Sequence, residues 1–203
     1  MFRSPLSLPN QGASNTLVMR RTPHAFTLIE VIITIALFVV LVIAVTQLYL
    51  VYRRVIILQQ SSIGIALGGS NVMDAIRTAG LQANQVAASH TFSGVSYSSG
   101  TTTAIFQIPS IDSSGAVILN TYDYIGIYAS STSVYDITDA AVGSTRSSGR
   151  KLLTDDLDAL TFTYDNAGPS LAASVIANAT TSAVVKGETI RLHLQEHIYL
   201  RNL

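Results

Sequence analysis

One apolar run near the start of the chain limits what the rest can fold into. Residues 31–52 contain no Asp, Glu, Lys or Arg. A helix of about 20 apolar residues crosses the hydrocarbon core of a bilayer, so the run predicts a membrane-spanning helix. Glu30 stands directly before the run, and a carboxylate within lipid carries a high free-energy cost. Because of this cost, we expect Glu30 to have a partner and a function.

The residues in front of this run form a recognisable combination. Arg20 and Arg21 make a basic stretch, residues 25–30 read AFTLIE, and the apolar run follows without interruption. With these features the chain resembles the type IV prepilins and the related pseudopilins of type II secretion. The resemblance implies a short basic leader that is removed before the protein is assembled.

The same resemblance implies two site residues for processing. An aspartyl prepilin peptidase would cleave between Ala25 and Phe26 and then methylate the new amino group of Phe26. The family usually has Gly before the cleaved bond, and this chain has Ala25. Since Ala has the next smallest side chain, we expect processing at a normal or reduced rate.

The resemblance implies that Glu30 has a role in the assembly of subunits. After cleavage, the amino group of Phe26 is cationic at neutral pH. An amine and a carboxylate a few ångströms apart attract strongly in a low dielectric, less the cost of desolvation. The resemblance implies that Glu30 pairs with the Phe26 amine of a neighbouring subunit.

A secretory signal peptide and an uncleaved anchor are the simpler interpretations of the first 52 residues. Signal peptides have apolar regions of about 7 to 15 residues that end at the cleavage site. Here the apolar run is longer and the expected cleavage site precedes it, which favours the prepilin interpretation. Residues 1–25 lack helical periodicity and are long for such a leader. Met19 offers an alternative start that leaves a leader of residues 19–25.

Charge predicts the orientation and narrows the partners. Lys and Arg beside a span favour the cytoplasmic side, so Arg20 and Arg21 predict a single pass with the C-terminal domain outside the cytoplasm. We expect a bacterial inner-membrane protein that later enters a pilus or pseudopilus. Its expected partners are the prepilin peptidase, membrane lipid, the inner-membrane assembly platform, and other minor and major pilins through the N-terminal helix.

Composition excludes several other functions. Three of the 12 basic residues precede Phe26, which leaves nine basic against 12 acidic residues in the processed chain. No basic stripe remains, so we expect no nucleic acid as a main partner. There is no Cys for a disulfide or thiolate metal site. No phosphate-binding loop, nucleophile elbow or catalytic carboxylate pair is recognisable, so we expect neither an enzyme nor a cofactor.

After the apolar run, the pattern predicts that one helix continues to about residue 79. Apolar or small residues recur at alternating three- and four-residue steps. They are Val55, Leu58, Ser62, Ile65, Gly69, Val72, Ile76 and Ala79. Gly64, Gly68 and Gly69 indicate either a bend or close packing against a sheet, and Gly80 fits a left-handed C-cap.

Beyond Gly80 the sequence predicts a β-rich head with long loops. Expected strands are residues 92–99, 101–108, 116–119, 122–128 and 160–164, with a turn at 109–115 and a leucine-rich helical turn at 150–160 that Thr154 or Asp155 caps. Residues 122–128 place Tyr122, Tyr124 and Tyr128 on one face. Residues 130–149 and 166–182 are expected to be loops.

The last strand has the clearest alternation. Its inward face is expected to carry Ile190, Leu192, Leu194, Ile198 and Leu200, and its outward face Arg191, His193, Gln195, His197 and Arg201. Glu196 interrupts the inward face, which predicts a bulge. The fold class is therefore α+β and type IV pilin-like, with a long N-terminal transmembrane helix packed on an antiparallel sheet. The expected parts are leader 1–25, span 26–52, helix continuation 53–80 and extracytoplasmic head 81–203.

Two groups of residues superficially suggest metal sites. His193, Glu196 and His197 lack the order of a zinc-protease helix, and on a strand the two imidazoles lie about 13 Å apart. Asp155, Asp156 and Asp158 lack the spacing and glycine of a calcium loop. We therefore predict no metal site, although calcium binding stays open.

The head resembles the W-type minor pilins and the J-type minor pseudopilins. The residues that carry this likeness are 76–80, the run from Leu152 to Tyr164, and the closing residues 200–203. The leading hypothesis is a minor pilin that primes or caps assembly of a type IV pilus. The alternatives are a minor pseudopilin of a type II secretion system, a pilus-tip adhesion or DNA-uptake module using residues 130–182, and a plain membrane-anchored β domain.

Overall fold

A single long helix begins the folded part of the chain. The structure is a computed structural model that describes residues 26–201. Helix α1 spans Leu28–Gln82 and passes without a break from the apolar run into the amphipathic segment. The chain divides into two compact units within this helix, after Tyr49. Residues 1–25, with Ala25, Arg20 and Arg21, and the closing residues 202–203 lie outside the described part.

The predicted periodicity of α1 is confirmed for its C-terminal part. Of the residues expected to face the head, Ile65, Gly69, Val72, Ile76 and Ala79 are buried. Val55 and Ser62 are exposed and Leu58 is half-buried. Tight packing therefore begins at Ile65, nearly three helical turns after the pattern starts at Val55. The helix also ends later than expected, at Gln82 rather than near residue 79.

Gly80 is a correction to the expected helix end. It lies inside α1 and is buried, rather than adopting the positive φ of a C-cap. A Cβ at Gly80 would lie 2.7 Å from Ile198 Cγ2. The missing side chain therefore lets the last strand approach the helix closely.

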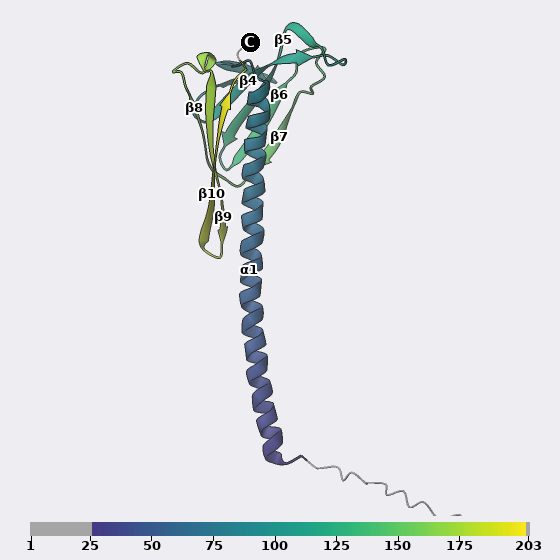
Figure 1. Cartoon of the computed structure of the whole chain (residues 1–203), viewed down its shortest axis with the longest axis vertical. Coiled ribbons are helices and arrows are strands. Elements are labelled where there is room, and N and C mark those ends of the chain that lie inside the picture. The colour runs from purple at the N-terminus through teal and green to yellow at the C-terminus, as the bar shows by residue number, and fades with distance from the viewer. Residues whose placement is uncertain (1–25, 202–203) are drawn as a thin grey trace, which may run out of the picture. The chain divides into compact units, whose positions relative to one another are not determined.

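In the described part of the chain, ten strands follow α1 in three antiparallel sheets. They are β1 Gln85–Val86, β2 Ser89–Phe92, β3 Val95–Ser98, β4 Thr103–Ile111, β5 Val117–Ser130, β6 Ser133–Asp139, β7 Gly149–Thr154, β8 Leu157–Tyr164, β9 Ser174–Val185 and β10 Glu188–Tyr199. A short 3-10 helix, η1, spans Pro169–Leu171. The sheet orders are β1-β4-β5-β6-β7, β10-β9-β8 and β2-β3. The α+β fold with an antiparallel head is thus confirmed (Figure 1).

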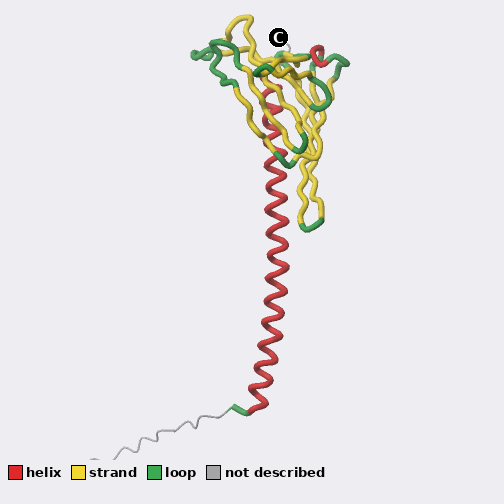
Figure 2. Tube along the Cα trace, turned by 180° about the vertical axis from the view of Figure 1, so that it is seen from behind, coloured by secondary structure: helices red, strands yellow, loops and turns green. Residues whose placement is uncertain are grey.

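The strands gather around the C-terminal part of α1, which the tube view also shows (Figure 2). The main core joins this part of the helix to one face of the five-stranded sheet and to the three-stranded sheet. Its fully buried members include Ile76, Phe106, Val134 and Val175. A second small core lies on the opposite face of the five-stranded sheet, where Phe92 of the β2–β3 hairpin packs with Ile105 and Tyr128.

Several predicted loops and turns are strands in the structure. Residues 130–149 contain β6, and residues 166–182 contain most of β9, so both loop predictions were wrong. The expected leucine-rich turn at 150–160 is also wrong, because β7 and β8 occupy it and Thr154 is a strand residue. The strand expected at 92–99 is confirmed for β3, but it begins later, because Ser93 and Gly94 have positive φ and form the turn of the β2–β3 hairpin.

The closing strand confirms the predicted alternation but not the predicted bulge. Along β10, Leu192, Leu194 and Ile198 are more buried than their neighbours. The register with β9 is continuous from Glu188 opposite Val185 to Tyr199 opposite Ser174. Glu196 stays on the inward face because it has a partner there, as described below.

Candidate functional site

The start of α1 positions the residues that the sequence singled out. Thr27 precedes the first helical residue, and its hydroxyl oxygen accepts a hydrogen bond from the Glu30 N–H at 3.3 Å. Its carbonyl accepts bonds from the N–H groups of Glu30 and Val31 at 3.1 and 3.3 Å. Thr27 is therefore the N-cap, and Glu30 is the third helical residue. The Thr-x-x-Glu spacing is a capping-box signal that our sequence analysis missed.

The cap leaves the Glu30 side chain uncommitted. Within residues 26–201, the Glu30 carboxylate takes part in no hydrogen bond or ion pair. A carboxylate in the first turn interacts favourably with the positive end of the helix dipole. The structure thus places Glu30 where its charge is partly stabilised by its own helix and is available to another group.

Phe26 lies two residues before α1 and is 78% exposed. Both members of the predicted Phe26–Glu30 assembly pair are thus at the start of the helix. The peptide bond that precedes Phe26 joins it to Ala25, which is outside the described residues. The predicted cleavage, methylation and pairing therefore stay predictions.

The helix surface that follows is apolar and uncovered. Every residue from 26 to 55 is exposed, and Leu37, Phe38 and Leu48 are each 65% exposed or more. By length and composition, α1 can cross a membrane. Such a surface is stable in lipid or against other apolar helices, and not in water.

Glu196 and Arg77 hold the end of α1 to the last strand. Arg77 Nε and Nη2 donate to the two oxygens of Glu196, each at 2.8 Å. The hydrogen bond from Arg77 lowers the pKa of Glu196, and the same pair raises the pKa of Arg77. This two-point pairing explains why an acidic residue occupies an inward position of β10.

The outward histidines of β10 do not form a metal site with Glu196. His193 Nδ1 lies 3.1 Å from Thr180 Oγ1, and the His197 ring packs on Tyr199. Asp158 accepts a hydrogen bond from Arg191 at 2.9 Å. In the described part of the chain, no group of three or more His, Cys, Asp or Glu residues is arranged to hold a metal.

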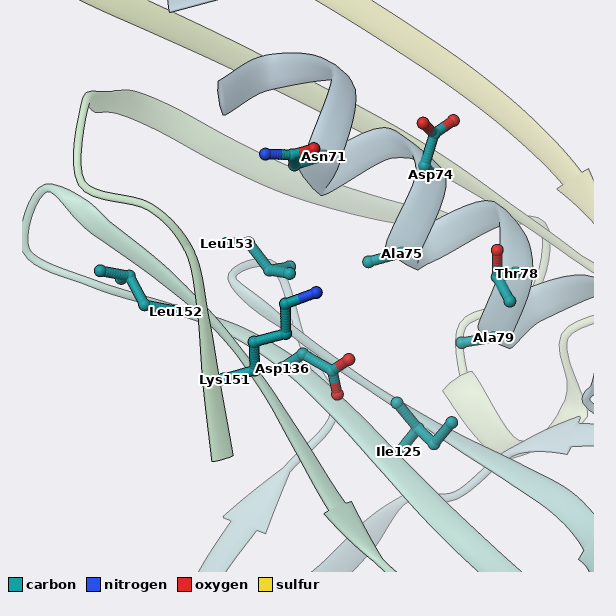
Figure 3. Close-up of a pocket in the computed structure, with 10 residues that line it drawn as sticks. All are labelled: Asn71, Asp74, Ala75, Thr78, Ala79, Ile125, Asp136, Lys151, Leu152 and Leu153. Carbon is teal, nitrogen blue, oxygen red and sulfur yellow. The ribbon is translucent and has the colours of Figure 1, made fainter. Parts of the chain in front are cut away.

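A hollow of about 330 Å³ lies between α1 and strands β5 to β7. Helix residues line one side, and Ile125, Asp136 and residues 151–153 line the other (Figure 3). Asp136 of β6 and Lys151 of β7 are cross-strand neighbours in register. The sequence analysis missed this site because only the pairing of β6 with β7 brings the two side chains together.

Asp136 is the unusual residue of this hollow. Its Oδ1 atom is buried and has no hydrogen-bond partner. Despite their register, Asp136 and Lys151 are not joined by an ion pair in the described structure. Desolvation by burial raises the pKa of Asp136, and the charge of Lys151 offsets this only in part.

Comparison with known proteins finds one match. A family model described as the prokaryotic N-terminal methylation motif matches residues 20–46. The match includes Phe26, Thr27 and Glu30 and runs into the apolar helix. No curated protein and no solved structure matches the chain.

Proposed function

We propose that this chain, which carries the N-terminal methylation motif of type IV pilins and pseudopilins, is a minor pilin that primes or caps assembly of a pilus fibre. The observation that carries the proposal is the continuity of this motif with an exposed apolar helix that ends in a packed β-rich head. The likeness of the head to W-type minor pilins favours a minor over a major subunit. The role is structural.

Processing is the first step of the proposed function. The prepilin peptidase removes residues 1–25 and methylates the amino group of Phe26. Before assembly, the apolar part of α1 is held in the inner membrane as a single pass, with the head outside the cytoplasm because Arg20 and Arg21 remain inside. The assembly platform then moves the subunit from lipid into a bundle of similar helices.

Glu30 supplies the pairing that orders this transfer. Its N–H group is used by Thr27, while its carboxylate has no partner within residues 26–201. The cationic amine of Phe26 in a neighbouring subunit offers the opposite charge. Pairing removes two unpaired charges from a medium of low dielectric, so it favours a subunit docked in one register over a subunit left in lipid.

Substitution of Glu30 tests the proposal. We expect Glu30→Val to be cleaved and methylated normally, because the peptidase acts four residues away, but to be absent from sheared fibres. The measurement is immunoblotting of membrane and fibre fractions, with the N-terminus checked by mass spectrometry. Incorporation of Glu30→Val at the wild-type level would refute the role of Glu30.

Thr27→Val is the matched control. It removes the capping hydroxyl that accepts a hydrogen bond from the Glu30 N–H, and this loss destabilises the helix by about 1 kcal/mol. The Glu30 carboxylate is kept. We expect this variant to enter fibres. If it fails in the same way as Glu30→Val, the defect belongs to the helix start rather than to the charge.

A minor pseudopilin of a type II secretion system is the second candidate, because the same N-terminus serves both machines and the head also resembles J-type pseudopilins. Deletion of the gene separates the two roles. Loss of surface fibres with normal exoprotein secretion supports the pilin, whereas exoproteins retained in the cell with normal fibres support the pseudopilin.

The third hypothesis, a tip module using residues 130–182 as exposed loops, loses much of its basis because β6 to β9 occupy most of that stretch.

A further inference from the structure

Among the described residues, two buried side-chain oxygens have no hydrogen-bond donor, Asn84 Oδ1 and Asp136 Oδ1, and Asp136 is the one that can carry a charge. Asp136 Oδ1 is buried and makes no hydrogen bond, although folded proteins satisfy most buried polar atoms. Asp123, a fully buried aspartate of the same sheet, has four donors, whereas Asp136 is half-buried. Of the two unsatisfied oxygens, only that of Asp136 belongs to an acidic group, so this carboxylate can accept a cationic donor from outside the chain.

The surroundings of Asp136 define the chemistry of that group. The hollow beside it has an apolar wall made by Ala75, Ala79, Ile125 and Leu153. Asp74 also lines the helix side, but its carboxylate points away from Asp136 (Figure 3) and lies 3.8 Å from Arg77 Nη1. A guest that fits has an apolar stem along the wall and a cationic end that donates hydrogen bonds to Asp136, which describes a lysine or arginine side chain.

Lys151 of the same chain does not fill this place. It lies opposite Asp136 in the β6–β7 register but is exposed and forms no ion pair with it among the described residues. A lysine on a flexible stem at an exposed position is able to move aside at low cost. Lys151 therefore competes weakly for the Asp136 carboxylate, and a better-placed cation displaces it.

We propose that the hollow between α1 and strands β5 to β7 receives a lysine or arginine side chain of a partner subunit, whose cationic end donates to Asp136. The identity of the partner as a subunit of the fibre rests on the proposed function, whereas the recognition of a basic side chain does not. The site gives the head a specific contact, separate from the apolar contact of the N-terminal helices.

Stability is the first test. If Asp136 awaits an external donor, its charge weakens the isolated fold, and Asp136→Asn raises the Tm by about 2 to 6 °C. The measurement is circular dichroism of the full chain in detergent at neutral pH. A fall in the Tm would overturn the proposal, because it would mean that Lys151 already satisfies the carboxylate.

Probe binding is the second test. Nα-acetyl-lysine methylamide is titrated into the full chain in detergent, and the signals of Ile125 and Leu153 methyl groups are followed by NMR. The matched probe is Nα-acetyl-norleucine methylamide, which keeps the apolar stem and lacks the charge. We expect the lysine probe to bind at least about tenfold more tightly, and Asp136→Asn to remove that preference.

Lys151→Gln distinguishes a cationic guest from other ligands. If Lys151 competes with the guest, the variant binds the lysine probe more tightly than the wild type does. Weaker binding in this variant would overturn the proposal and indicate a guest that accepts hydrogen bonds from Lys151. Equal affinity for the lysine and norleucine probes, or binding of neither, would also overturn it. None of these readouts needs assembly, so failure of the proposed function would be seen separately, with Glu30→Val.

Discussion

At the scale of single residues, Asp123 shows how the head satisfies a buried charge. Its side chain is fully buried and accepts hydrogen bonds from Ser110, the Ala141 N–H, Ser144 and Arg146. Arg146 also donates to the Pro109 carbonyl and to Gln82 at the end of α1. One carboxylate thereby holds the segment after β6 against β4, β5 and the helix.

These bonds predict how stability depends on pH. Burial alone would raise the pKa of Asp123, but the hydrogen bonds together lower it below its ordinary value. The folded-state pKa is therefore below the unfolded one. Asp123 contributes stability above the unfolded pKa of about 3.9, and this contribution is lost as the pH falls through the lower folded-state value.

We expect Asp123→Asn to destabilise the head by about 2 to 4 kcal/mol, because an amide leaves Arg146 without its counter-charge. Urea unfolding of the full chain in detergent, followed by circular dichroism, measures the change. The loss should shrink at pH values below the folded-state pKa of the wild type. The exposed Asp155→Asn is the matched control, and an equal midpoint shift in both variants would contradict the argument.

At the scale of elements, the glycines of α1 have different tasks. The sequence left bending and close packing as equal explanations. A Cβ at Gly69 would lie 2.7 Å from Leu194 Cδ1, and one at Gly80 would lie 2.7 Å from Ile198 Cγ2. A Cβ at Gly64 would have no neighbouring atom within 4 Å. Close packing of strands on the helix thus explains Gly69 and Gly80, but not Gly64.

This difference predicts opposite effects of the same substitution. Gly64→Ala should stabilise the protein by about 0.5 to 1 kcal/mol, because Ala favours the helix and meets nothing. Gly80→Ala should destabilise it by about 1 to 2 kcal/mol, because the β-branched Ile198 is stiff and has to shift. Urea midpoints of the two variants measure both effects. A stabilising Gly80→Ala would show that β10 can move away from the helix freely.

The elements that sequence predicted are those with a strong local period. Helix α1 and strand β10 repeat apolar residues at helical and two-residue spacing over many residues. Strand β9 was missed because its buried face is made of small residues, such as Ala177, Ala179 and Thr181. Thr181 donates to the Ile65 carbonyl of α1 at 3.0 Å, so small residues are what this close contact requires.

Among the candidate sites, too, sequence predicts what a local pattern reveals and misses what only strand pairing brings together. Glu30 was predictable because an acid beside an apolar run is conspicuous, and the Thr27 cap was readable from the Thr-x-x-Glu spacing. Asp136 and Lys151 are 15 positions apart and meet only through the β6–β7 register. The sequence does not predict this register, because residues 130–149 read as a loop and residues 150–160 as a helical turn.

At the scale of the whole molecule, the proposed function requires the chain to move from lipid into a bundle of helices. The exposed apolar surface of residues 26–52 needs lipid or other helices, and the match to the methylation motif covers the first part of this surface. Cleavage before Phe26 would remove three basic residues and create one new amine, so it shifts the net charge from zero toward negative. The new amine of Phe26 would be the only positive group that cleavage adds near Glu30.

Processing is therefore the event on which the assembly argument depends. We expect the chain, expressed with its own prepilin peptidase, to have an intact mass that lacks residues 1–25 and carries one added methyl group. N-terminal sequencing should begin with N-methylated Phe26, and expression without the peptidase should give the uncut chain. A mature start at Phe26 means that the peptidase accepts Ala25 and that the amine exists to pair with Glu30. An uncut chain in the presence of the peptidase means a static membrane anchor, in which Phe26 has no free amine and Glu30 has no partner of the proposed kind.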